Sequence, residues 1–147
     1  MNILIVGLGL IGGSYAMGLK KKGHIIYGVD ISTETLDYAI KNEMIKEGSQ
    51  SPEDYIEKSD LIIIGLYPNK ILEFLDKYHN LFKSNQIITD VCGVKTSYLQ
   101  DAIKKALPAT YISHHPMAGR EKVGINYANN NIFKGANFLI CDVNNKI

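Results

Sequence analysis

Two segments far apart in the chain carry residues that could do chemistry together. Near the N-terminus, Gly7-Leu8-Gly9-Leu10-Ile11-Gly12 follows a short apolar run. In the last third, His114-His115-Pro116-Met117-Ala118-Gly119-Arg120-Glu121 places two imidazoles beside a proline and a glycine. A glycine-rich turn that opens a helix is typical of dinucleotide binding, and a histidine can accept a proton at neutral pH. Each signal is weak alone, but together they predict hydride transfer.

The glycine motif stands in the context that dinucleotide binding requires. It follows a predicted strand, opens a predicted helix and lies in a unit of about 30 residues that ends on an acidic side chain. Gly7 permits the tight turn, Gly9 leaves room for the pyrophosphate, and Gly12 lets the helix pack close to the strand. The phosphates would bind free N–H groups at the start of the helix. We expect the cofactor to contact the whole turn, which comprises Gly7, Leu8, Gly9, Leu10, Ile11 and Gly12.

Asp30 ends the second predicted strand, where the adenosine ribose would lie. Its carboxylate can accept hydrogen bonds from both ribose hydroxyls and would repel a 2′-phosphate. Residues 31–34 include no arginine or lysine that could hold such a phosphate. The sequence therefore predicts NAD rather than NADP as the cofactor.

Leu66, Tyr67 and Pro68 follow the apolar run of residues 61–64. In an open α/β sheet, the carboxyl ends of the strands line the ligand crevice. These three residues are therefore expected to border one of the cofactor riboses. A plain strand-to-helix turn, with Pro68 at the start of the helix, is the alternative interpretation.

The segment Thr89-Asp90-Val91-Cys92-Gly93-Val94-Lys95-Thr96 also follows a predicted strand and faces the same crevice. Val91 and Gly93 are candidate contacts of the nicotinamide, because a glycine allows close approach of the backbone. Lys95 lies near the start of a predicted helix, where a positive charge is unfavourable. It indicates either an anionic ligand or partner nearby, or simply a solvated lysine.

His115 is the candidate catalytic base. It precedes Pro116, which favours an extended backbone, and it lies between a strand end and a turn at Gly119. An imidazole there could take the proton of a substrate hydroxyl. His114 is expected to point to the opposite side of the extended segment.

The chain is expected to form a doubly wound, mostly parallel α/β sheet, a Rossmann-type dinucleotide-binding domain. Continuous apolar runs predict strands buried on both faces, and the helices between them predict parallel crossovers. The stretch 114–134 has no clear period and is expected to be a functional loop. The predicted strands are 3–6, 25–29, 61–64, 86–89, 111–113 and 136–141, and the predicted helices are 10–22, 33–42, a short one opened by 51–54, 69–78 and 96–106.

Composition narrows the function classes. The formal net charge of +1 gives no reason to expect a nucleic-acid surface. Cys92 and Cys141 form neither a metal-ligand nor a redox spacing, so we expect no metal site and two reduced thiols. No apolar run approaches the roughly 20 residues needed to cross a bilayer, and the N-terminal run is too short for a signal peptide. A cytoplasmic protein without membrane contact is the expectation.

The chain resembles the nucleotide-binding domain of the arogenate/prephenate dehydrogenase family over essentially its whole length. The matching pieces are Val6-Gly7-Leu8-Gly9-Leu10-Ile11-Gly12-Gly13-Ser14, Asp30, Asp90-Val91-Cys92-Gly93-Val94-Lys95, His115-Pro116-Met117-Ala118-Gly119 and Glu121-Lys122.

The resemblance implies a reaction and a domain organisation. The reaction is NAD-dependent oxidative decarboxylation of prephenate, or the corresponding step on arogenate, with His115 as the base. For prephenate the product is 4-hydroxyphenylpyruvate, on the route to tyrosine. Residues 1–147 would be the dinucleotide-binding domain. A helical substrate and dimerisation domain is expected after residue 147, so the full-length protein would be a homodimer and this stretch alone inactive.

One departure from the family and two alternative functions remain open. Many family members carry serine where this chain has Gly93, so only the backbone, or Cys92, could orient the substrate there. A dehydrogenase like the β-hydroxyacid dehydrogenases or imine reductases shares the N-terminal half, but its catalytic lysine from a later domain does not explain the His115 segment. A regulatory module that senses NAD would account for the short chain but not for His115.

Overall fold

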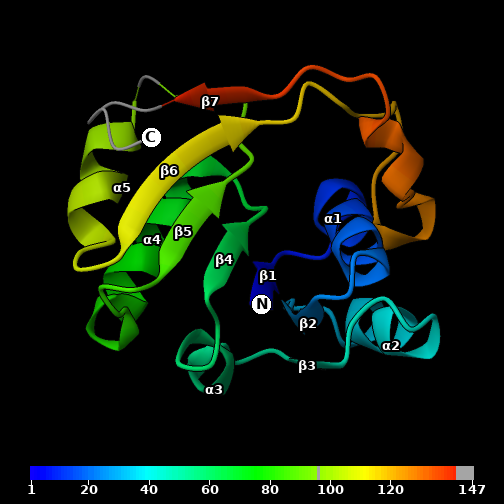
Figure 1. Cartoon of the computed structure of the whole chain (residues 1–147), viewed down its shortest axis with the longest axis horizontal. Helices are drawn as coiled ribbons and strands as arrows, with labels where there is room; N and C mark the ends of the chain where they lie inside the picture. The colour runs from blue at the N-terminus through cyan, green and yellow to red at the C-terminus, as the bar shows by residue number, and fades with distance from the viewer. Residues whose placement is uncertain (96, 142–147) are drawn as a thin grey trace.

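Seven strands form one sheet in the order β3-β2-β1-β4-β5-β6-β7 (Figure 1). Neighbouring strands are parallel except for β6 and β7, which pair antiparallel. The predicted doubly wound, mostly parallel sheet is thereby confirmed. The computed structural model describes residues 1–95 and 97–141. The strands are β1 (Asn2–Val6), β2 (Ile25–Val29), β3 (Glu47–Ser49), β4 (Leu61–Ile64), β5 (Ile87–Asp90), β6 (Thr110–His115) and β7 (Leu139–Cys141).

Helices cover both faces of the sheet. Helices α1 and α2 contribute to one hydrophobic cluster, and α3, α4 and α5 contribute to the other, on the opposite face (Figure 1). The helices are α1 (Leu10–Lys21), α2 (Thr33–Lys41), α3 (Glu53–Ile56), α4 (Pro68–Tyr78) and α5 (Leu99–Lys105), with the 3-10 helices η1 (His79–Leu81), η2 (Ile125–Tyr127) and η3 (Asn130–Phe133).

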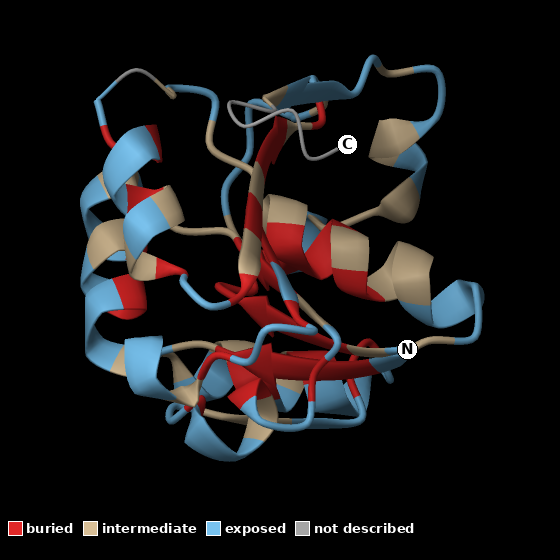
Figure 2. Ribbon diagram, turned by 60° about the vertical axis from the view of Figure 1, so that its left-hand side comes forward, coloured by how far each residue is buried: buried red, intermediate tan, exposed pale blue. Residues whose placement is uncertain are grey.

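The strands are apolar on both sides because both sides are buried. In β1, Leu4 and Val6 join the cluster under α3–α5, while Ile3 and Ile5 join the cluster under α1 and α2. Side chains that alternate along a strand point to opposite faces, so a strand between two helical layers needs apolar residues at every position. Figure 2 shows the strands as a buried layer between helices whose outer surfaces are exposed.

The structure differs from the predicted elements mainly at β3, β6, α5 and β7. The last strand, predicted as 136–141, is observed only as Leu139–Cys141. Strand β3 has the sequence Glu47-Gly48-Ser49, which carries no apolar signal, and the prediction missed it. Strand β6 is longer than predicted and includes His115 as its last residue. The predicted helix 96–106 is observed as Leu99–Lys105, and its predicted first residue, Thr96, lies outside the described residues.

The segment predicted as a functional loop folds back on α1. Helices η2 and η3 lie in it, and both contact α1. The Asn129 backbone N–H donates to the Ser14 hydroxyl at 2.9 Å, and Lys21 donates to the Asn130 side chain at 2.9 Å. Met117, rather than Gly119, takes the left-handed backbone conformation, with φ of 43°. The segment is thus fixed along the first helix of the nucleotide-binding unit.

His114 connects this segment to the sheet. Its imidazole is 4% exposed and forms hydrogen bonds at both ring nitrogens, to the Thr89 hydroxyl at 2.6 Å and to the Tyr15 hydroxyl at 2.8 Å. The ring also stacks on Phe138, with centroids 4.6 Å apart. Burial lowers the pKa of His114 to about 4; the charge of Asp90 opposes this shift, and the charges of Lys95 and His115 add to it. The imidazole is therefore neutral at physiological pH.

Stability should fall as the pH is lowered from about 6.5 to about 4. In that window the unfolded chain binds a proton at His114 and the folded chain does not, so protons favour unfolding. The total loss expected from this group is roughly 3 kcal/mol of unfolding free energy. Urea unfolding at a series of pH values measures it.

The variant His114→Gln should flatten this part of the profile, because it removes the titrating group. Tyr15→Phe is the matched control, since it removes one hydrogen bond but leaves the imidazole in place. In Tyr15→Phe the dependence of stability on pH should persist, because burial is the largest cause of the lowered pKa of His114. An unchanged slope in His114→Gln would show that another group is responsible.

Candidate active site

The parallel register aligns the carboxyl ends of five strands in one row. Val29 pairs with Val6, Val6 with Ile64, Ile64 with Asp90, and Asp90 with Ser113. One residue further along each strand, the row continues with Asp30, Gly7, Gly65, Val91 and His114. The chain passes from β1 outward to β3 and returns to β4 on the other side of β1, so the strand order reverses between β1 and β4. Ligands of doubly wound sheets bind at such a reversal.

The glycines of the N-terminal turn have different tasks. Gly7 has φ of 89°, and a Cβ on it would lie 2.7 Å from the carbonyl oxygen of Gly65. A Cβ on Gly12 would lie 1.9 Å from the carbonyl oxygen of Gly7, so only glycine fits where α1 crosses β1. A Cβ on Gly9 would meet nothing within 4 Å. The fold itself therefore requires Gly7 and Gly12, while Gly9 leaves open space at the start of α1.

The first turn of α1 is available to an anion. Gly9 is its N-cap, so no side chain caps the helix, and the turn contains no acidic residue. Backbone N–H groups at a helix start lack partners within the helix and attract negative charge. Leu10 and Ile11 are partly exposed here, whereas the Leu8 side chain is fully buried in the core. Open space beside free donors fits a dinucleotide phosphate.

Asp30 lies directly after β2 and holds the glycine turn. Its Oδ2 accepts from the backbone N–H of Leu8 at 2.8 Å, and its Oδ1 accepts from the backbone N–H of Ser32 at 2.9 Å. Each carboxylate oxygen can accept more than one hydrogen bond, so ribose hydroxyls could bind as well. The Leu8 N–H is thus engaged within the protein and is not a free donor.

Leu66, Tyr67 and Pro68 follow β4 at the same edge. The Leu66 side chain lies against the glycine turn, since a Cβ on Gly7 would be 3.1 Å from its Cδ2. Tyr67 is the N-cap of α4 and is 81% exposed, and Pro68 is the first residue of that helix. This geometry is compatible both with a wall of the cofactor site and with a plain strand-to-helix turn.

His115 lies at the carboxyl end of β6 and is partly buried. Its Nδ1 is 3.0 Å from the carbonyl oxygen of Val91. A carbonyl only accepts, so Nδ1 carries the proton and the neutral ring keeps its lone pair on Nε2. Gly93 lies beside the ring, since a Cβ there would be 3.4 Å from Cε1. As predicted, His114 and His115 point to opposite sides of the strand. Among the described residues, both ring nitrogens of His114 have hydrogen-bond partners, whereas His115 has one at Nδ1 alone.

The buried carboxylate of Asp90 organises this region, although the sequence did not predict that role. Lys95 forms an ion pair with it at 2.9 Å, and the Lys95 side chain is only 14% exposed. The anionic partner suggested by the position of Lys95 is therefore Asp90, within the protein, and Lys95 is not a solvated surface residue. Cys92 packs against the core, and its thiol and that of Cys141 are free.

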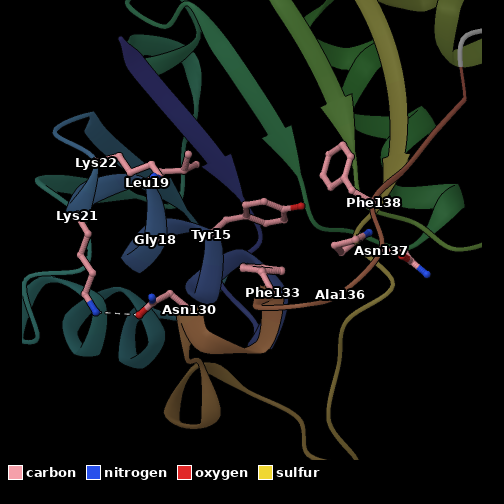
Figure 3. Close-up of a pocket in the computed structure, with 11 residues that line it drawn as sticks. Tyr15, Gly18, Leu19, Lys21, Lys22, Asn130, Phe133, Ala136, Asn137 and Phe138 are labelled. Carbon is pink, nitrogen blue, oxygen red and sulfur yellow. Dashed lines mark hydrogen bonds between the residues drawn. The ribbon is translucent and has the colours of Figure 1, made fainter.

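A cavity of about 520 Å³ lies beside α1 (Figure 3). The rings of Tyr15 and Phe133 lie side by side in it, with centroids 4.6 Å apart, and Phe138 lines the opposite side. None of the predicted site residues lines this cavity. The predicted site is instead an open edge of the sheet, in front of the first turn of α1.

The described residues show neither a cluster of metal ligands nor a helix suited to a membrane. In residues 1–95 and 97–141, no three His, Cys, Asp or Glu side chains come together as they would around a metal ion. Within the same ranges, no helix has the length and apolar character needed to span a membrane.

Known proteins resemble this chain in sequence over nearly its full length. Residues 15–146 match the family described as prephenate dehydrogenase, nucleotide-binding domain. Prephenate dehydrogenase of Bacillus subtilis (strain 168) is 34% identical over 144 residues, which cover 95% of this chain and 38% of that protein. Prephenate dehydrogenase of Lactococcus lactis is 28% identical, over 96% of this chain and 41% of that protein. The chain thus spans less than half the length of these curated relatives.

Solved structures agree with these relatives. Arogenate dehydrogenase of Synechocystis superposes with a TM-score of 0.91 at 30% identity, over 98% of this chain and 51% of that one. Prephenate dehydrogenase of Aquifex aeolicus, in complex with hydroxyphenyl propionate and NAD⁺, superposes with a TM-score of 0.90 at 29% identity over the same shares. A Streptomyces aurantiacus imine reductase, at 14% identity and a TM-score of 0.68, shares the fold alone. Sequence and fold together show that this chain belongs to the family of prephenate dehydrogenase nucleotide-binding domains.

Proposed function

We propose that this domain binds NAD and supplies the base for the oxidative decarboxylation of prephenate to 4-hydroxyphenylpyruvate. The observation that carries the proposal is the hydrogen bond from His115 Nδ1 to Val91, which leaves Nε2 as a proton acceptor at the carboxyl edge of the sheet. The Aquifex aeolicus relative, with NAD⁺ and hydroxyphenyl propionate, supports the choice of cofactor and of substrate class.

The residues at the sheet edge are suited to hold the cofactor. The first turn of α1 would bind the phosphates, Gly9 would leave room for them, and Asp30 would accept from the ribose hydroxyls. Leu66 and Val91 would border the remainder of the NAD molecule. When bound, NAD supplies the hydride acceptor.

The task of His115 is to remove a proton. Its Nε2 would accept the proton of the ring hydroxyl as the hydride leaves the same carbon. Loss of carbon dioxide then makes the ring aromatic, which drives the reaction. An imidazole held by one hydrogen bond at Nδ1 needs no rearrangement before it accepts a proton at Nε2. The presence of such a base favours an enzyme over a module that only senses NAD.

The remainder of the substrate site is proposed to come from a helical region, such as the family resemblance implies, in a homodimeric protein. The relatives are more than twice as long as the matched part. An apolar hollow of about 240 Å³ on the sheet, lined by Leu61, Ile87 and Ile140, offers a surface against which such a region could pack. Whether prephenate or arogenate is the substrate would be decided by contacts in that region.

The variant Gly9→Ala should weaken NAD binding without destabilising the protein. The new methyl group meets nothing in the protein but occupies the space proposed for the phosphates. Gly12→Ala is the contrasting variant and should lose stability, because its methyl group collides with the Gly7 carbonyl. Calorimetric titration with NAD and thermal unfolding separate the two effects. Unchanged NAD affinity in Gly9→Ala would place the cofactor elsewhere.

The variant Asp30→Asn should narrow the preference for NAD over NADP. It removes the charge that repels a 2′-phosphate but keeps an acceptor for the backbone N–H of Leu8 or Ser32. Titration of both proteins with both nucleotides measures the change. Equal affinities for NAD and NADP in the unmodified protein would contradict the proposed cofactor.

The variant His115→Asn should keep NAD affinity and lower kcat about 10²- to 10⁴-fold, as is typical of a lost general base. The measurement follows NADH formation in a form that turns prephenate over, either this chain or a longer product with the region that its relatives add. His114→Asn is the control; an equal loss of kcat there, with folding intact, would mean that the base is wrongly assigned.

A further inference from the structure

Asp90 is a buried carboxylate that collects five hydrogen-bond donors. Oδ1 accepts from the Cys92 backbone N–H at 2.9 Å, from Lys95 Nζ at 2.9 Å and from the Tyr98 hydroxyl at 2.7 Å. Oδ2 accepts from the hydroxyls of Tyr111, at 2.7 Å, and Ser113. The side chain is 0% exposed. Asp90 therefore joins the loop that follows β5 to the neighbouring strand β6.

These donors keep Asp90 charged in spite of its burial. Burial alone would raise the pKa of Asp90, but hydrogen bonds from Ser113, Lys95, Tyr111 and Tyr98 outweigh it and hold the pKa below its usual value. A buried charge without partners is costly, so the surrounding groups are fixed in the positions that satisfy it. Asp90 is thus a rigid anchor beneath the sheet edge.

Lys95 extends this anchor toward His115. Besides its bond to Asp90, Nζ donates to the carbonyl oxygen of His114 at 2.8 Å. That carbonyl belongs to the peptide group that joins His114 to His115. One ammonium group therefore holds both the loop after β5 and the backbone that carries the proposed base.

The same loop also holds the imidazole of His115. Val91 accepts the Nδ1 proton at 3.0 Å, and Gly93 lies against the ring. Between them, Cys92 is held by its N–H bond to Asp90. The tautomer of His115 consequently depends on where the loop lies, and the loop depends on Asp90 and Lys95.

We propose that Asp90 and Lys95 are positioning residues, which hold the loop 91–95 so that His115 keeps its proton on Nδ1 and its lone pair on Nε2. The proposal rests on the proposed function for its kinetic consequence, but its structural part can be measured without turnover. Neither residue is required to touch substrate or cofactor.

The test is the tautomer of His115, read from ¹⁵N shifts of the imidazole by NMR on the unmodified chain and on variants. The unmodified chain should show the Nδ1–H form. Lys95→Met, which removes the bond to the His114 carbonyl while leaving four donors on Asp90, should shift His115 toward the Nε2–H form. Lys95→Arg keeps the charge and the donors and should restore much of the Nδ1–H form.

Lys70→Met is the matched control, because it removes an ion pair with Glu73 on the exposed surface of α4. It should leave the His115 tautomer unchanged. Should Lys95→Met fail to fold, Lys95→Gln keeps a polar group without the charge and carries the same measurement. A folded Lys95 variant with the tautomer of the unmodified chain would overturn the proposal.

Kinetics then separate this proposal from the proposed function. In a form that turns prephenate over, Lys95→Met should lower kcat about 10- to 100-fold with little change in NAD affinity, as is typical of a misplaced catalytic group. If Lys95→Met loses the Nδ1–H form of His115 but keeps its kcat, the positioning role is upheld and His115 is refuted as the base. A preserved tautomer with lowered kcat would refute positioning and indicate that Lys95 contacts the substrate directly.

Discussion

The parallel register of the sheet is the constraint on which the site depends. It sets Val29, Val6, Ile64, Asp90 and Ser113 in one row, so that the residues after them meet at one edge although they are far apart in sequence. A shift of one residue in any strand would turn its apolar side chains from one core cluster to the other. Because both faces are buried, such a shift would cost folding free energy. The packing of the core therefore fixes the geometry of the site.

Close contacts of the backbone add a second constraint at that edge. The Cβ distances divide the glycines of the N-terminal turn into those that the packing requires, Gly7 and Gly12, and one that it does not, Gly9. A motif read from sequence cannot make this division, because it depends on how near α1 approaches β1 and β4. Asp30 links the turn to β2 through the Leu8 N–H, so the same carboxylate that is proposed to bind ribose also fixes the loop beside it.

Much of this arrangement could be predicted from the sequence, and the reason for each failure is physical. Six of the seven strands were predicted from their apolar residues, which are needed where a strand is buried between two helical layers. Strand β3 is a short edge strand with polar residues, so its sequence gives no such signal. The antiparallel pairing of β7 could not be foreseen, because strand direction depends on the path of the preceding segment. The network around Asp90 was equally hidden: its donors come from β6 and from the loop after β5, and only the folded sheet brings them together. Lys95 was the member of this network that the sequence did single out, because a cation near the start of a helix is electrostatically unfavourable.

Alternation along β6 gives the two adjacent histidines different surroundings. Alternation along β6 sends His114 into the layer next to α1, where the hydroxyls of Thr89 and Tyr15 engage both ring nitrogens. The same alternation sends His115 to the other side, where its Nδ1 bonds the carbonyl oxygen of Val91. His114 is thereby fixed in place, and its carbonyl, bound by Lys95, becomes the backbone support of its neighbour. The base proposed here needs a ring that is held in place and a nitrogen that can accept a proton. At this strand end His114 provides the fixed backbone, and His115, bound through Nδ1, is proposed to provide Nε2.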